Sequence, residues 1–179
     1  LAAYYTAAEA GSHRDGVRAW EAAQRQLHES TPDDVDAAAF WALAHLAIAP
    51  SDDSTYAHQK RAGAVLEARL DTAPRHPGLF HYLIHAYDNP VLAEDAIDVA
   101  RAYDKLAPDV PHALHMPSHI FVRLGIWPDV IDWNRRSADA ALRQSPDAYT
   151  SLHHAHALDY MMYAHLQRGE DQKARAVLD

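Results

Sequence analysis

The chain contains no cysteine and only six glycines among 179 residues. The absence of cysteine excludes disulfides, thiolate metal sites, iron–sulfur clusters and a cysteine nucleophile. No apolar run reaches the roughly 18 residues that a transmembrane helix needs, so we expect no membrane insertion. The formal net charge of −9 argues against a nucleic-acid partner, because surfaces that bind phosphate are basic.

Alanine and histidine are present in excess, with 36 and 14 copies respectively. Many alanines combined with few glycines favour closely packed helices, and no segment shows the alternation of a strand. The overall composition is that of a soluble globular protein. Because the first residue is Leu1, the N-terminus is not informative about the compartment, which stays open between cytoplasmic and exported.

An internal repeat of 34 residues relates two parts of the chain. Shifting 77–104 onto 111–138 gives seven identities over 28 positions without a gap. Pro74 and Pro108 are separated by the same interval. A period of this length, punctuated by prolines and short polar clusters, is typical of stacked helical hairpins.

Three glycines mark the expected ends of first helices within these hairpins. Gly125 and Gly169 superpose when the last hairpin is aligned with 111–134 at a shift of 44 residues. Gly11 occupies the same kind of position in the first hairpin. Glycine is common just after a helix, because it adopts the left-handed backbone conformation without steric cost.

A helix–turn–helix period of 34 residues resembles the tetratricopeptide repeat (TPR). The last hairpin carries the consensus large, glycine, small and large residues at Leu158, Gly169, Ala174 and Leu178. The resemblance implies an all-α, TPR-like right-handed solenoid of about five hairpins in a single domain over 1–179, with first helices lining a concave groove. The expected hairpins are 2–29, 33–72, 77–106, 112–144 and 150–178.

Two sequence strings are also similar to those of a group of bacterial TPR-like proteins. They are HPGLFHYLIHAYD at 76–88 and PHALHMPSHIF at 111–121. This narrower resemblance implies the same fold and carries no assigned activity.

Histidines and aspartates recur at helical spacing on three of the expected first helices. Residues at i, i+3, i+4 and i+7 share one face of a helix, and the repeat alignment gives the three faces equivalent registers. The stripes are His81, His85 and Asp88; His112, His115 and His119; and His156, Asp159 and Tyr163. In the TPR resemblance these positions face the groove, so imidazoles and carboxylates from neighbouring helices would converge there.

Such a cluster of nitrogen and oxygen donors predicts a site for a metal ion or a small ligand. Two histidines four positions apart on a helix reach one ion together, and these donors bind Zn, Fe, Cu, Ni or Mn. The expected primary ligands are His81, His85, His115 and His119. The reserve set is Asp88, His112, His156 and Asp159.

Pro117 complicates this geometry, because it lies between His115 and His119 and removes one helical hydrogen bond. We expect either a kink at this point or a regular helix that starts near Pro117, after an irregular lead-in over 111–116.

Three functions are compatible with these patterns. The leading hypothesis is a TPR-like binding scaffold whose groove holds a His/Asp-rich metal or ligand site. The first alternative is a plain module for protein or peptide interaction, in which the histidines are structural. The second is a His-dependent metalloenzyme, hydrolytic or O2-using. The sequence identifies no catalytic residue and no oligomeric state.

Overall fold

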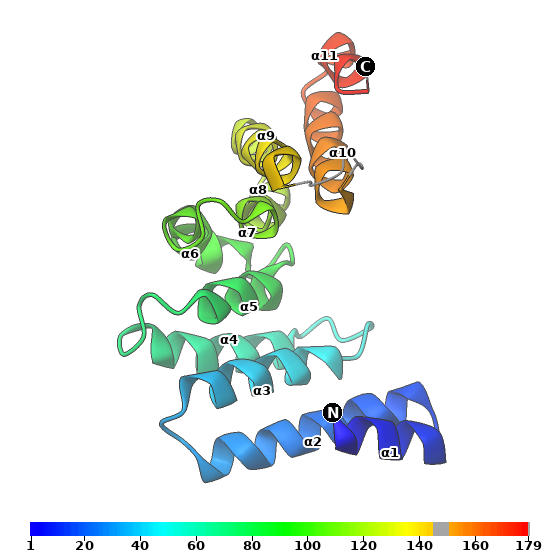
Figure 1. The fold of residues 1–179 in the computed structure, drawn as a ribbon, viewed down its shortest axis with the longest axis vertical. Helices are drawn as coiled ribbons and strands as arrows, with labels where there is room; N and C mark the ends of the chain where they lie inside the picture. Colours follow the sequence, from blue (N-terminus) through cyan, green and yellow to red (C-terminus); the bar gives the residue numbers. More distant parts are fainter. Residues whose placement is uncertain (145–150, 179) are drawn as a thin grey trace. The chain divides into compact units, whose positions relative to one another are not determined.

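The computed structural model describes residues 1–144 and 151–178, which are mostly helical and include no strand (Figure 1). The chain divides into two compact units, Leu1–Ala86 and Tyr87–Asp179, here called unit 1 and unit 2. The expectation of one domain over 1–179 stays a prediction. Within the described ranges, no helix has the length and apolar character needed to cross a membrane.

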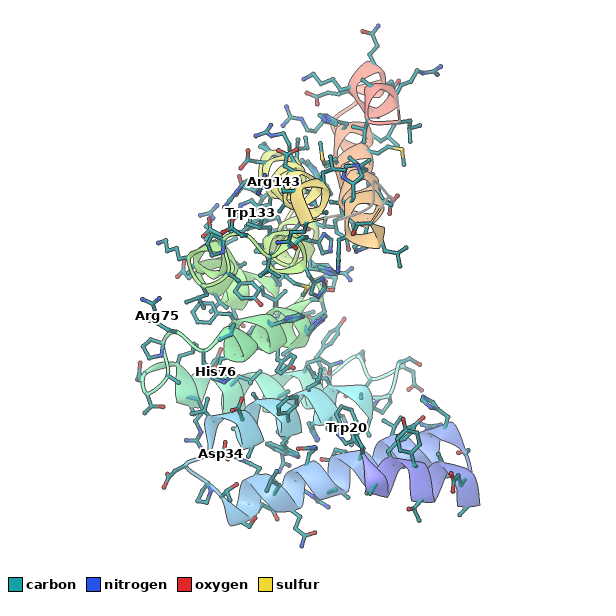
Figure 2. All side chains as sticks on the ribbon, in the orientation of Figure 1. Trp20, Asp34, Arg75, His76, Trp133 and Arg143 are labelled. Carbon is teal, nitrogen blue, oxygen red and sulfur yellow. The ribbon has the colours of Figure 1, made fainter. Side chains whose placement is uncertain are left out.

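Unit 1 consists of two helical hairpins followed by a single helix. Its helices are α1 (Ala2–Ala10), α2 (His13–Ser30), α3 (Val35–Ala47), α4 (Ala57–Leu70) and α5 (Pro77–Tyr87), the last of which reaches the boundary with unit 2. Local sequence sets where two of them begin. The Ser12 hydroxyl and the Asp15 carboxylate each accept a backbone N–H of the other residue, which forms a capping box before α2. The Asp34 carboxylate (labelled in Figure 2) caps α3 by a single bond, which it accepts from the backbone N–H of Ala37.

Small residues let the helices of unit 1 approach one another closely. The α3 helix buries five alanines almost completely: Ala37, Ala38, Ala39, Ala42 and Ala44. A Cβ atom placed on Gly16 of α2 would lie 2.9 Å from the ring of Tyr4 and 2.9 Å from Ala8, both on α1. The contact between α1 and α2 therefore requires glycine at this position.

A buried carboxylate and a pair of stacked histidines link three helices of unit 1. Glu21 on α2 accepts hydrogen bonds from Nε1 of Trp41 at 3.0 Å and from Nδ1 of His45 at 3.2 Å, both on α3. His58 of α4 stacks on His45, with ring centroids 4.5 Å apart. Burial lowers the pKa of His45 below its ordinary value, although the hydrogen bond to Glu21 acts in the opposite direction. His45 is therefore neutral at pH 7.

Unit 2 contains shorter helical pieces and two long helices. They are η1 (Ala93–Ala96), α6 (Ile97–Ala102), η2 (Tyr103–Lys105), α7 (Pro111–His115), α8 (Pro117–Arg123), α9 (Trp127–Gln144), α10 (Leu152–Gln167) and α11 (Asp171–Ala176). The second half of the hairpin expected over 77–106 is thus three short pieces instead of one helix. Residue 150, where the last hairpin was expected to begin, lies outside the described residues.

Pro117 separates α7 from α8. Of the two alternatives predicted for this point, the irregular lead-in over 111–116 is wrong, because Pro111–His115 is an α-helix, and the chain is instead broken between two helices at the proline. The N–H of His119 bonds to the carbonyl of Met116 at 3.1 Å, which is a tight turn, and the Ser118 hydroxyl donates to the carbonyl of His115 at 2.6 Å. The helix is therefore interrupted at the predicted residue, and the local hydrogen bonds are remade around the proline.

Two of the three marked glycines adopt the expected left-handed backbone conformation. Gly125 and Gly169 both have a φ of +68°, where an L side chain would be strained. Gly11 ends α1 with a different conformation, φ −144° and ψ −106°. The helix ends after α8 and α10 thus follow the sequence signal.

The α9 helix supplies much of the core of unit 2. Trp133 (Figure 2) is only 8% exposed and packs against Phe121 of α8, with ring centroids 5.9 Å apart. The guanidinium of Arg136 lies 4.8 Å from the centre of the Trp133 ring. The side chain next to Trp133, Asn134, is fully buried although it is polar.

We expect His45 to make unit 1 less stable as the pH falls below about 6.5, the ordinary pKa of histidine. Because the folded chain lowers the pKa of His45, the unfolded state binds more protons in this range. The stabilisation is complete above about pH 6.5 and is lost as the pH falls toward the folded pKa. Thermal unfolding followed by tryptophan fluorescence at about pH 7.5 and about pH 5.5 measures the effect.

The H45Q variant should show a smaller difference in Tm between these two pH values than the wild type. The exposed His13 provides the control, and H13Q should keep the wild-type difference. An equal difference in wild type and H45Q would show that His45 does not cause the pH dependence.

Candidate metal centre

Three imidazoles converge in unit 2. His115 ends α7, His119 lies on α8 and His156 lies on α10, and one ring nitrogen of each lies within 4.8 Å of the other two. The Nε2 atoms of His115 and His119 are 3.0 Å apart. His115 is buried, His119 is half-buried and His156 is exposed, so the group is open to solvent at His156. We call these residues the three-histidine group.

Asn134 of α9 fixes the His115 ring by a hydrogen bond at Nδ1, the nitrogen that does not face His119. The Asn134 Nδ2 donates to the carbonyl of Val130 at 2.8 Å, which leaves its Oδ1 to accept the Nδ1–H of His115 at 2.7 Å. With the proton on Nδ1, the lone pair of His115 lies on Nε2, the atom that faces His119. Burial lowers the pKa of His115 to about 3, against the effect of the Asn134 hydrogen bond. The ring is therefore neutral at pH 7, which is the form that binds metal.

Asp88 holds the His119 ring in the corresponding way. Its Oδ2 accepts the Nδ1–H of His119 at 2.9 Å, and its Oδ1 accepts Nε–H of Arg123 at 2.7 Å. Burial acts to raise the pKa of the Asp88 carboxyl, but the hydrogen bonds from His119 and Arg123 outweigh it and lower the pKa. A carboxylate behind an imidazole is the usual support of a metal-binding histidine, because it fixes the ring and makes Nε2 a stronger donor.

Tyr160 of α10 packs against all three imidazoles. Its ring centroid lies 4.6 Å from that of His115, 5.4 Å from that of His119 and 5.1 Å from that of His156. Burial, and then the charge of Asp88, raises the pKa of the Tyr160 hydroxyl. A neutral phenol ring therefore covers one side of the group and limits the access of water.

The short distance between the Nε2 atoms of His115 and His119 requires a positively charged species between them. Two unprotonated nitrogens repel each other at 3.0 Å, so a proton or a cation between them is needed to hold them there. Two histidine nitrogens bound to one tetrahedral zinc ion, each at about 2.0–2.1 Å, would lie about 3.3 Å apart. The observed spacing is close to this value, and His156 is placed to supply a third nitrogen.

His112 lies beside the three-histidine group and not within it. Its ring centroid is 6.2 Å from that of His115 and 5.6 Å from that of His153. Among the reserve residues, His156 thus joins the group and Asp88 supports it from behind, whereas His112 flanks it.

Asp159 occupies a different surface of α10 from the one predicted. It lines an apolar cleft with Leu158 and Met162 of the same helix and with Val177 and Leu178 after α11. Successive helical residues point about 100° apart, and here Tyr160 takes the position against the imidazoles. Tyr163, in the same predicted stripe, contacts Trp127.

His81 and His85 form a pair in unit 1. Both lie on α5, their Nε2 atoms are 3.0 Å apart and their rings stack with an interplanar angle of 27°. The pair therefore has the same i, i+4 spacing and the same distance between Nε2 atoms as His115 and His119.

Asn134 is a residue of the candidate site that was not predicted from the sequence. The residue interrupts the buried face of α9, where its neighbours one helical turn away are Val130 and Ala138. A polar side chain on such a face needs a hydrogen-bond partner. A polar residue on this apolar face was the sign in the sequence that Asn134 has a specific partner. The partner is His115 of the candidate site.

No protein-family model matches the chain, and no curated protein sequence matches it. Solved structures do match it. A structure described as "Crystal structure of MamA protein" has a TM-score of 0.68 at 12% identity and covers 99% of this chain and 85% of that one. A MamA AMB-1 structure gives 0.66 at 16% identity, covering 98% and 90%, and a MamA MSR-1 structure gives 0.63 at 15% identity, covering 97% and 87%.

These likenesses extend over almost the whole chain and concern the fold alone, because so few residues are identical. They confirm the expected fold class, an all-α helical-repeat protein of the TPR-like type. The likeness to these solved structures does not confirm the narrower resemblance carried by the two histidine-containing strings at 76–88 and 111–121.

We expect replacement of Asn134 by leucine to lower the free energy of unfolding by about 1–3 kcal/mol, because the buried Nδ1–H of His115 would lose its 2.7 Å acceptor and keep only a long contact of 3.5 Å with the Ser118 hydroxyl. The matched control is D132N, on the same helix at a more exposed position, which should change stability by less than about 0.5 kcal/mol. Urea unfolding measures both. Equal stabilities of N134L and the wild type would show that this hydrogen bond does not stabilise unit 2.

Proposed function

We propose that this chain is a helical-repeat interaction scaffold that carries a transition-metal site in unit 2. Arrays of helical hairpins present extended surfaces to partner proteins or peptides, which supports the scaffold part of the proposal. One observation carries the metal part: the Nε2 atoms of His115 and His119 face each other at 3.0 Å while their Nδ1 atoms are held by Asn134 and Asp88.

The donor set indicates the class of metal. Neutral imidazole nitrogens suit Zn, Cu, Fe and Ni, whereas Mn prefers oxygen donors. Three histidines leave at least one coordination position for water or a small ligand, as in many zinc sites. We assign no reaction to that position.

The proposal includes His81 and His85 as a second, weaker site in unit 1. Two imidazole nitrogens 3.0 Å apart on one helix are able to bind an ion whose other positions are filled by water. With two protein donors instead of three, this site should have the lower affinity of the two.

A shared proton is the competing explanation for the contact between His115 and His119. His119 would then be an imidazolium paired with Asp88 and would donate from Nε2 to His115. The histidines would be structural, as in a plain protein- or peptide-interaction module. A partner that binds equally well with chelator present and to the H85A/H119A variant would favour this module.

Protein purified without chelator and without metal-affinity resin should contain close to one equivalent of Zn, Cu, Fe or Ni by elemental analysis. For calorimetric titrations with Zn2+, bound metal is first removed with a chelator, which is then removed by desalting. H119A and H156A should each raise the Kd on the order of 100-fold, because each removes one of three donors; this equals the largest loss usual for an outer partner. H81A/H85A should remove only the weaker binding event.

The control for H156A is H154A. His154 lies on the same helix, and its Nδ1 contacts the carbonyl of Ala138 at 3.2 Å, away from the three-histidine group. H154A should therefore keep the wild-type affinity. Wild-type protein that binds none of the four metals at micromolar concentrations would refute the metal site and leave the scaffold alone.

We also expect D88N to weaken Zn2+ binding by about 10–100-fold, the usual cost of losing the partner behind a metal-binding histidine. D159N is the matched control, because it removes the same charge from unit 2 at the apolar cleft. D159N should change the Kd by less than about twofold. Similar losses in both variants would indicate a general charge effect and not the support that Asp88 gives to His119.

A further inference from the structure

Unit 1 contains a basic cavity that the proposed metal sites do not use. It measures about 400 Å³, a size suited to small ligands. It lies between the first two turns of α2 and the end of α3 with the loop that follows. The lining residues are His13, Arg14, Val17 and Arg18 from α2, and residues 47–51.

Every ionisable residue that lines this cavity is basic, in a chain with a net charge of −9. Arg14 and Arg18 lie one turn apart on α2 and are both exposed. Within the described ranges, neither has a carboxylate at salt-bridge distance or a side-chain hydrogen bond. By contrast, carboxylates pair with several other arginines, among them Arg101, Arg123 and Arg136.

The acidic residue between the two cavity arginines, Asp15, is hydrogen-bonded to Ser12 and not to either arginine. Its carboxylate accepts hydrogen bonds from the backbone and the hydroxyl of Ser12, at 3.0 and 2.7 Å. These bonds hold the pKa of Asp15 low, and the two arginines contribute less. His13 is oriented by a hydrogen bond of 2.7 Å between its Nδ1 and the Tyr4 hydroxyl. The positive charge of the cavity therefore comes from side chains, and chiefly from the two guanidinium groups.

The wall of the cavity that faces α2 is formed by the end of α3 and carries a weak negative charge. The end of α3 contributes the equivalent of about half a negative charge through its terminal carbonyls. The two guanidinium charges exceed this partial charge, so the charged groups of the lining itself are net positive. Asp15, Asp52 and Asp53 are close to lining residues along the chain but do not line the cavity. Val17, Ile48 and Pro50 supply an apolar surface beside these charges.

We propose that the basic cavity binds a small organic anion. Its carboxylate or phosphate group pairs with Arg14 and Arg18, because a guanidinium matches either group with two parallel hydrogen bonds. A short hydrocarbon part of the ligand lies against Val17 and Ile48. This site and the three-histidine group share no residue, so the failure of one leaves the other unaffected.

NMR titration of the full chain with butyrate, succinate and inorganic phosphate tests the proposal. Saturable shifts should be confined to residues near 12–18 and 47–51, and R14Q should weaken binding by about tenfold. R25Q is the matched control, since Arg25 is exposed on the same helix outside the cavity and should keep wild-type affinity. A47W fills the cavity without changing charge and should also weaken binding, because Ala47 lines it at an exposed position that tolerates a larger side chain.

Equal weakening by R14Q and R25Q would reveal diffuse attraction to a basic surface and would overturn the proposal. Unchanged binding to A47W would overturn it as well, since the cavity would not be the binding place. The same conclusion would follow if none of the three probes gave saturable shifts up to about 10 mM. A clear preference for phosphate over both carboxylates, with the expected variant pattern, would identify the ligand class as a phosphate.

Discussion

Hydrogen bonds to two polar side chains, Asn134 and Asp88, determine where the histidines of unit 2 can lie, because a buried donor that loses its acceptor is costly. Asn134 is fully buried on α9 and has two partners, the carbonyl of Val130 and the Nδ1–H of His115. That arrangement dictates which nitrogen of His115 keeps its lone pair. Asp88 does the same for His119. The 3.0 Å contact between the two Nε2 atoms follows from these two supports.

Unit 1 shows a second use of the same principle. Glu21 is buried between helices and accepts hydrogen bonds from Trp41 and His45, while His58 stacks on His45 from the next helix. The carboxylate thus joins α2 to α3, and the stacked pair of histidines joins α3 to α4, beside a helix that buries five alanines. Alanine contacts bring helices close but specify little about their relative rotation, so a buried polar group adds directional information. Its effect on stability depends on pH through the histidine.

Much of the candidate site was predictable from spacing alone. The 34-residue shift placed His115 and His119 in register with the histidines of 76–88, and the shift of 44 brought in His156. The same registers assigned Asp159 to the site, whereas Tyr160 lies against the imidazoles and Asp159 lines an apolar cleft. The alignment fixes the order of residues along a helix but not the rotation of that helix about its axis. One residue of rotation is about 100°, which is enough to exchange one side chain for its neighbour.

By itself, the sequence determined the class of fold, the break at Pro117, the helix ends at Gly125 and Gly169 and the helical faces that carry histidine. Each of these depends on local backbone chemistry or on a period within one or two helices. Only the tertiary structure decided which imidazoles meet, which nitrogen of each ring is free, and that an asparagine on α9 and an aspartate before η1 stand behind them. Those outcomes depend on side-chain packing between segments 31 and 19 residues apart, as for Asp88 with His119 and His115 with Asn134. Packing between helices is a property of shape and burial that no single helix encodes.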